Sequence, residues 1–126
     1  MPETSADSID LPVAVRALRD AMNSHDPQRV ADCFTTDYEV VTPLQPAMGF
    51  VGNDNVLRNW TQIFARIPDL HAEVLRTAVN GTEVWSEWWM TGTKVNGEPA
   101  QLGGPAIWTE RDGLVASARF YLQQVA

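Results

Sequence analysis

The chain has 126 residues, 44% of them hydrophobic and 20% charged, which is the composition of an ordinary globular domain and not of a disordered chain. Its net charge of −7 argues against nucleic acids and anionic membranes as partners, and a single cysteine, Cys33, excludes an internal disulfide. The acidic start lacks the pattern of a signal peptide and no apolar run reaches transmembrane length, so we expect a cytoplasmic protein. We expect a flexible tail at residues 1–9 and a single domain at residues 10–126.

Three helices are predicted in the first half of the chain, because apolar residues recur there at intervals of three and four. Proline suits the first turn of a helix, so Pro12 marks the start of the first helix and residues 26–27 the capped start of the second. We expect the second helix to end at residues 35–37. The third is predicted to begin at residues 53–54 and to end at Pro68.

After the third helix the hydrophobic pattern changes to a period of two, which predicts strands. Four long strands are expected at residues 70–79, 83–94, 101–110 and 114–123, after a short one at residues 38–42. The Asn80-Gly81 and Asn96-Gly97 pairs are typical of hairpin turns, and residues 111–113 form the third turn. Helices followed by consecutive hairpins predict an α+β fold in which the three helices pack on a curled antiparallel sheet.

The second long strand carries three of the five tryptophans of the chain. Side chains alternate along a strand, so Trp85, Glu87 and Trp89 share one face, and Trp88 and Met90 share the other. A carboxylate between two indoles is costly to bury unless it is paired, protonated or used, so this acid is the sharpest functional candidate.

The third and fourth long strands each present an apolar row that we expect to face the helices. These rows are Leu102, Gly104, Ala106 and Trp108 on the third strand, and Ala116, Ala118, Phe120 and Leu122 on the fourth. Small residues leave space beneath the helices, and together with the row that contains Glu87 they predict an aromatic-walled hollow. The opposite face, with Trp88, Met90, Ile107 and Tyr121, is too apolar to remain free, so a homodimer packed sheet to sheet is expected.

Three roles are open for Glu87. Desolvation between indoles would raise its pKa and make it a catalytic base near neutral pH. It could instead be a polar anchor for a ligand, or a structural residue bonded to Asn59, Trp60 or a tyrosine. A shift of the strand register by one residue would place it in solvent.

Further residues are expected to bind the substrate or simply to form core: Tyr38, Thr42, Met48, Asn59, Trp60, Trp85, Trp89, Trp108 and Phe120. The loop at residues 43–52 is apolar despite its prolines and glycines, so we expect it to cover part of the protein. His25, His71 and Cys33 do not have the spacing of a zinc site, and no phosphate loop is present, so no metal or cofactor is predicted.

The motifs at residues 23–26 (Asn-Ser-His-Asp), 49–52 (Gly-Phe-Val-Gly) and 89–93 (Trp-Met-Thr-Gly-Thr), in this order of elements, resemble the nuclear-transport-factor-2-like superfamily, and its SnoaL-like polyketide-cyclase branch in particular. The resemblance covers residues 12–124. It implies a cone-shaped α+β barrel of the cystatin-like kind, with a pocket between helices and sheet and often a dimer.

The chain departs from the enzymes of that superfamily at their acidic positions. Where similar ketosteroid isomerases have a tyrosine, a base and a second acid, this chain has Leu18, Thr42 and Ala106. Where epoxide hydrolases resembling limonene-epoxide hydrolase have an inward acid on the last strand, this chain has Phe120, and of their middle-strand pair it keeps only the acid, Glu87.

The expected function is therefore a pocket for a small apolar or aromatic molecule. If the protein is an enzyme, Glu87 would move a proton in an isomerisation, cyclisation, hydration or hydrolysis. The alternatives are a carrier that binds without catalysis and an interaction module that uses the outer face of its sheet.

Overall fold

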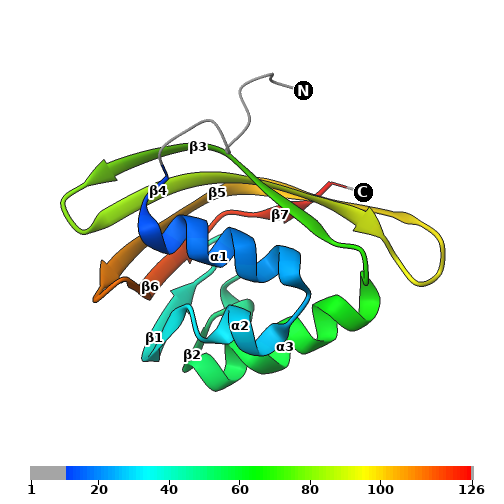
Figure 1. Cartoon of the computed structure of the whole chain (residues 1–126), viewed down its shortest axis with the longest axis horizontal. Coiled ribbons are helices and arrows are strands. Elements are labelled where there is room, and N and C mark those ends of the chain that lie inside the picture. Colours follow the sequence, from blue (N-terminus) through cyan, green and yellow to red (C-terminus); the bar gives the residue numbers. More distant parts are fainter. Residues whose placement is uncertain (1–10, 126) are drawn as a thin grey trace.

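A computed structural model of the protein describes residues 11–125, in which the helices lie in the first half of the chain and pack against a long curved sheet (Figure 1). The predicted tail at residues 1–9, and residues 10 and 126 at the ends of the predicted domain, lie outside the described residues. The α+β cone that we expected is confirmed. Among residues 11–125, no helix combines the length and the apolar character needed to cross a membrane.

The three helices are α1 (Val13–Ser24), α2 (Pro27–Ala31) and α3 (Asn53–Arg66). The buried stripe of α1 faces the sheet and includes Val15, Leu18 and Met22, and the left-handed backbone of His25, with φ of 61°, ends the helix. Helix α2 begins as predicted, because the Asp26 carboxylate accepts the backbone N–H of Gln28 at 3.0 Å. It ends earlier than residues 35–37, and the chain turns directly into a strand.

The strands are β1 (Phe34–Val41), β2 (Phe50–Val51), β3 (His71–Asn80), β4 (Glu83–Thr93), β5 (Pro99–Arg111), β6 (Leu114–Phe120) and β7 (Gln123–Gln124). The sheet order is β2-β1-β6-β5-β4-β3, and β7 pairs with β5. The predicted meander from β3 to β6 is antiparallel throughout. The sheet as a whole is mixed and not purely antiparallel, because β1 runs parallel to β6.

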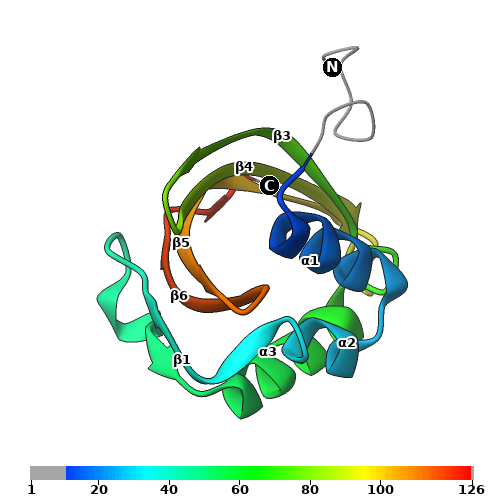
Figure 2. The ribbon, with the colours of Figure 1, turned by 60° about the vertical axis from the view of Figure 1, so that its left-hand side comes forward.

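The concave side of this sheet is where the helices lie. Figure 2 shows α1 inside the curve of the sheet, with α2 and α3 on the side that the strands leave open. Two tryptophans from neighbouring strands, Trp88 and Trp108, are buried against each other on this side, with ring centroids 6.2 Å apart. The curvature therefore produces an interior surface with aromatic side chains on the sheet and aliphatic ones on the helices.

The hairpin between β4 and β5 decides which residues of β4 face that interior. A two-residue turn at Asn96-Gly97 would pair residue 95 with residue 98 and would bring Trp85 onto the face of Trp108. The structure instead pairs Thr93 with Pro99 across a five-residue loop, closed by hydrogen bonds between Lys94 and Glu98 and between Gly97 and Lys94. This loop moves the register by one residue.

A one-residue change of register moves every side chain of a strand to the other face. The interior row of β4 is consequently Val84, Ser86, Trp88 and Met90, all of which are buried. The row with Trp85, Glu87 and Trp89, which we expected to face the helices, lies on the outer side of the sheet. Of the interior row predicted for β5, Leu102, Ala106 and Trp108 line the cavity described below, and Gly104 does not.

Candidate functional site

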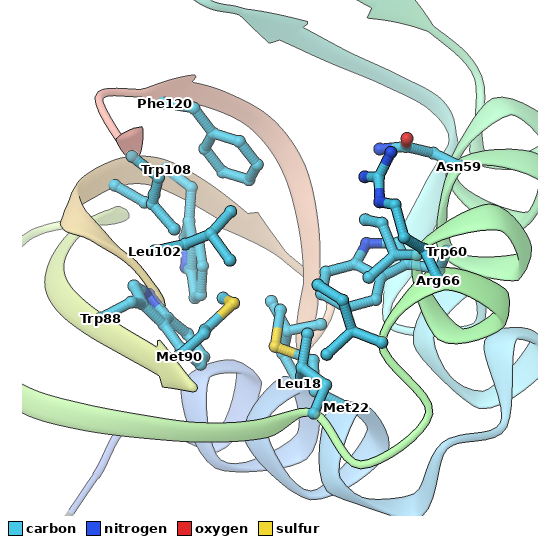
Figure 3. Close-up of a pocket in the computed structure, with 15 residues that line it drawn as sticks. Leu18, Met22, Asn59, Trp60, Arg66, Trp88, Met90, Leu102, Trp108 and Phe120 are labelled. Carbon is cyan, nitrogen blue, oxygen red and sulfur yellow. The ribbon is translucent and has the colours of Figure 1, made fainter. Parts of the chain in front are cut away.

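A cavity of about 200 Å³ lies between the concave face of the sheet and helices α1 and α3 (Figure 3). Its lining is mainly apolar and aromatic. The residues that line it are Leu18, Met22, Asn59, Trp60, Ile63, Arg66, Ile67, Leu70, Trp88, Met90, Leu102, Ala106, Trp108, Phe120 and Leu122. Concave sites with apolar walls and a few polar groups are the usual form of a small-molecule site.

The sheet side of the cavity consists of large side chains around one small one. Trp88 and Met90 come from β4, Trp108 from β5 and Phe120 from the end of β6, while Ala106 leaves open the space that a larger side chain would fill. Gly104, the register partner of Trp88, does not line the cavity, because the backbone of Tyr121 and Leu122 packs closely against it. Of the small residues on which the predicted hollow depended, Ala106 lines this cavity.

The helix side of the cavity is held to the sheet by the motif at residues 23–26. The Asn23 carboxamide donates to the Ala72 carbonyl oxygen at 3.0 Å and accepts the Ala72 N–H at 2.7 Å, as a neighbouring strand would. His25 Nε2 lies 2.7 Å from the Leu70 carbonyl oxygen, and its ring meets Phe64 edge to face. These contacts attach the end of α1 to the start of β3 and to α3.

Polar groups in the lining are few. Among the described residues, the lining contains no Asp, Glu, His, Cys, Ser, Thr or Tyr, and its only polar side chains besides the indoles are Asn59 and Arg66. Trp88 donates its indole N–H to Ser86 Oγ at 2.8 Å, behind the cavity wall. The indole N–H of Trp108 is buried and has no acceptor among the described residues. The wall thus offers hydrophobic contact and hydrogen-bond donors, and no side chain that could act as a general base.

The structure places Glu87 outside the cavity, which corrects the expectation that this acid is desolvated between indoles. Its carboxylate forms an ion pair with Arg76 Nε at 3.0 Å across β3 and β4, and its side chain is 41% exposed. The five-residue hairpin loop, which sets the register, is the physical reason. The proposed role of Glu87 as a base in an aromatic pocket therefore has no structural support.

The two tryptophans that flank Glu87 are outside the cavity as well. Trp85 is 46% exposed and donates its indole N–H to Glu83 Oε1 at 2.9 Å. Trp89 lies over Gly103 on the outer face, so close that a Cβ at Gly103 would come within 2.5 Å of the indole. Both belong to the outer surface of the sheet and not to the lining.

Three other predicted substrate-binding residues also lie elsewhere. Tyr38 is a buried residue of β1 that packs between Phe34 and Phe50, with ring centroids 4.5 and 6.0 Å away, and burial raises the pKa of its phenol well above the usual range. Thr42 donates its hydroxyl to the Gln45 carbonyl oxygen within the loop. Met48 is 61% exposed, so the apolar loop at residues 43–52 does not cover the cavity there.

Four of the predicted residues do line the cavity, namely Asn59, Trp60, Trp108 and Phe120. Sequence reasoning missed the contribution of Trp88 and Met90, because it put them on the outer face. It also missed Arg66, although a signal was available. Arg66 follows Asn59 by seven positions, or about two helical turns, so both residues lie on the same side of α3.

Cys33 is not a reactive group of this site. Its side chain is buried, its Sγ donates to the Arg29 carbonyl oxygen at 3.4 Å, and burial together with the charge of Asp32 raises the pKa of the thiol to about 11. Among residues 11–125, no three His, Cys, Asp or Glu side chains are grouped so that they could hold a metal ion.

The family model for the SnoaL-like domain matches residues 15–118, which is most of the chain. The chain belongs to the SnoaL-like family. A search of curated proteins finds no match. The resemblance seen in the three motifs is thereby confirmed at the level of the family.

Solved structures with this fold carry several activities in their names. A protein of Catenulispora acidiphila with a ketosteroid isomerase-like fold, solved in complex with trimethylamine, has a TM-score of 0.78 at 18% identity and covers 89% of this chain and 87% of its own. A putative polyketide cyclase of Sinorhizobium meliloti has a TM-score of 0.69 at 24% identity, with coverages of 90% and 96%. An epoxide hydrolase of M. tuberculosis that is similar to limonene-epoxide hydrolase has a TM-score of 0.74 at 16% identity, with coverages of 89% and 81%.

These likenesses establish the fold of the SnoaL-like chain and not its chemistry, because every identity is below 25%. In the sequence, this chain has apolar residues at several positions where similar isomerases and hydrolases have catalytic ones, and the structure shows where these residues lie. Leu18, Ala106 and Phe120 all line the cavity, so apolar side chains stand in the lining at those positions.

Proposed function

We propose that this SnoaL-like protein binds a small apolar or aromatic molecule in its cavity and holds it without acid–base catalysis by the cavity wall. The observation that carries the proposal is the composition of the lining. It has three tryptophans and a phenylalanine, with a lining alanine on the sheet side, and none of its described side chains is a carboxylate, an imidazole, a thiol or a hydroxyl.

The size of the cavity limits the ligand. Drug-sized ligands occupy pockets of about 300–1,000 Å³, whereas an apolar cavity of about 150 Å³ accepts a benzene ring. A volume of about 200 Å³ therefore favours a single ring with one short substituent. Aromatic walls would contribute dispersion and hydrophobic contact to such a ligand.

Thermal unfolding in the presence of toluene and ethylbenzene tests the proposal. A ligand that binds only the folded state stabilises it by about 2.7 kcal/mol at a hundredfold excess over its Kd, so Tm should rise with ligand concentration. Ala106→Leu should abolish the rise, because the new side chain occupies the cavity. Ala78→Leu, on the outer face of β3, is the matched control and should retain it.

Two results would contradict the proposal. One is a Tm of the wild-type protein that does not respond to any small apolar ligand. The other is an equal ligand response in Ala106→Leu and in the wild type, which would place the binding outside the cavity.

We also propose a homodimer through the outer sheet face. The residues of that face differ from those expected, because Trp88 and Met90 lie inside. That face carries Trp85, Trp89 and Ile107, together with the exposed side chain of Val41. An exposed tryptophan among apolar neighbours supports an association surface.

Sedimentation equilibrium of the wild type and of Trp85→Glu tests the dimer. The substitution would place an unpaired charge in the interface, so the dimer should dissociate more readily. Val95→Glu is the control, because Val95 is also an exposed apolar residue but lies in the β4–β5 loop. A wild-type protein that sediments as a monomer at all concentrations would exclude this dimer.

A further inference from the structure

The cavity has one polar end, which helix α3 supplies. Asn59 and Arg66 both line the cavity and are both exposed to solvent, so they stand where it opens. Figure 3 shows these two side chains on the α3 side, across the cavity from Trp108 and Phe120. A ligand whose ring lies against the aromatic wall would therefore direct its substituent towards an amide and a guanidinium.

Among the described residues, Arg66 is the arginine that lines the cavity. Arg76 pairs with Glu87, and Arg111 pairs with Asp37. Arg66 has no carboxylate partner among the described residues, and no described residue of the lining is acidic. The nearby Asp69 carboxylate, three positions along the chain, accepts the Thr93 N–H at 2.7 Å and is thus engaged elsewhere.

From this geometry we infer that the cavity takes a monocyclic aromatic carboxylate or a comparably small apolar carboxylate, with the ring against Trp108 and Phe120 and the carboxylate at Arg66. This inference rests on the proposed function and adds the charge of the ligand. A guanidinium presents two parallel N–H donors to a carboxylate, and the Asn59 carboxamide can donate a third hydrogen bond.

The pairing also explains how a protein of net charge −7 could attract an anion. At 0.1 M salt, repulsion between the anion and acidic side chains more than about 10 Å away is largely screened. A direct contact with the Arg66 guanidinium is much shorter than this distance and is therefore screened far less. A simpler role for Arg66 is to stabilise helix α3, because a positive charge in the last turn interacts favourably with the helix dipole. That role would affect stability and would leave ligand selectivity unchanged.

The experiment compares three probes of one shape by isothermal titration calorimetry in about 0.1 M salt, at which the long-range repulsion is screened: phenylacetate, phenylacetamide and phenethylamine. The wild type should bind phenylacetate about tenfold more tightly than phenylacetamide, because hydrogen bonds to a charged group are the stronger class. Phenethylamine should bind most weakly. Added salt should reduce the preference for phenylacetate.

Variants on α3 assign the preference to one residue. Arg66→Gln should weaken phenylacetate binding about tenfold and leave phenylacetamide binding within about twofold of the wild type, and Arg66→Lys should recover part of the loss. Arg58→Gln is the matched control. Arg58 lies on the same helix and is exposed, but it contacts Asn55 and does not line the cavity, so its loss should not change the preference.

Each contrary outcome separates this inference from the proposed function. Equal affinity of the wild type for phenylacetate and phenylacetamide, or a preference that survives Arg66→Gln, would overturn the carboxylate inference and leave apolar binding intact. Tightest binding of phenethylamine would overturn it in favour of a cation among the indoles. If none of the three probes and no neutral arene bound, both proposals would be wrong.

Discussion

Trp88 donates its indole N–H to Ser86 Oγ at 2.8 Å in the interior of the sheet, and the serine hydroxyl in turn lies 3.3 Å from the Ala106 carbonyl oxygen. Both side chains are buried. The pair therefore satisfies an indole N–H immediately behind the cavity wall and holds the ring that forms part of that wall.

We expect Ser86→Ala to destabilise the protein by about 1–3 kcal/mol, because it leaves the Trp88 N–H buried without an acceptor. Urea unfolding measures the change. The chain offers a matched control on the opposite face, where Trp85 donates to Glu83 in the same two-residue spacing but is 46% exposed. Glu83→Ala should cost less than about 0.5 kcal/mol, since water replaces the lost acceptor. If the two variants lost similar amounts of unfolding free energy, burial would not be what makes the lost hydrogen bond costly.

The ion pair between Arg76 and Glu87 should contribute little to stability and nothing to ligand binding. Arg76 is 82% exposed and Glu87 41% exposed at the side chain, and exposed pairs contribute about 0.2–1 kcal/mol. Glu87→Gln, Arg76→Gln and the double variant form a cycle that measures the coupling energy by urea unfolding. Calorimetry with the cavity ligand should give the same Kd for all four proteins. A Kd that changes tenfold in Glu87→Gln would restore a functional role for this acid.

Cys33 should react slowly with thiol reagents as long as the protein is folded. Its pKa of about 11 leaves far less thiolate at pH 8 than a free cysteine has, and burial also blocks access. We expect the reaction with a disulfide reagent to be more than about a hundredfold slower in the native protein than in urea. If Cys33 reacted at rates within a few fold of each other in the native protein and in urea, the buried position of its thiol would be contradicted.

The same raised pKa has a consequence for stability at high pH. A group whose folded pKa is raised contributes stability that is fully present below its unfolded value, here 9.0, and that is lost as the pH rises towards about 11. Urea unfolding of the wild type and of Cys33→Ala at pH 7 and pH 10.5 measures this contribution. The unfolding free energy should fall less between the two pH values in the variant than in the wild type. An equal loss in both proteins would assign the alkaline effect to other groups.

Local patterns in the sequence account for most of the fold. The apolar spacing on α1, the Asp26-Pro27 cap and the breaker Pro68 act over a few residues, so the helices could be predicted without tertiary information. The glycine-containing turns predicted the hairpins from β3 to β6 for the same reason. The pairing of β1 with β6 could not be predicted in this way, because it joins residues about eighty positions apart.

The sequence by itself determined an α+β layout of helices on a curled sheet, because this follows from local spacing and turn residues, and its motifs carried the resemblance to the SnoaL-like family. Only the tertiary structure decided which acid and which tryptophans face the cavity. Both faces of β4 carry tryptophan, so hydrophobicity did not choose between them, and a loop of five residues instead of two set the register. That one difference puts Trp88 inside and Glu87 outside, and it leaves Arg66 on α3 as the charged side chain of the cavity.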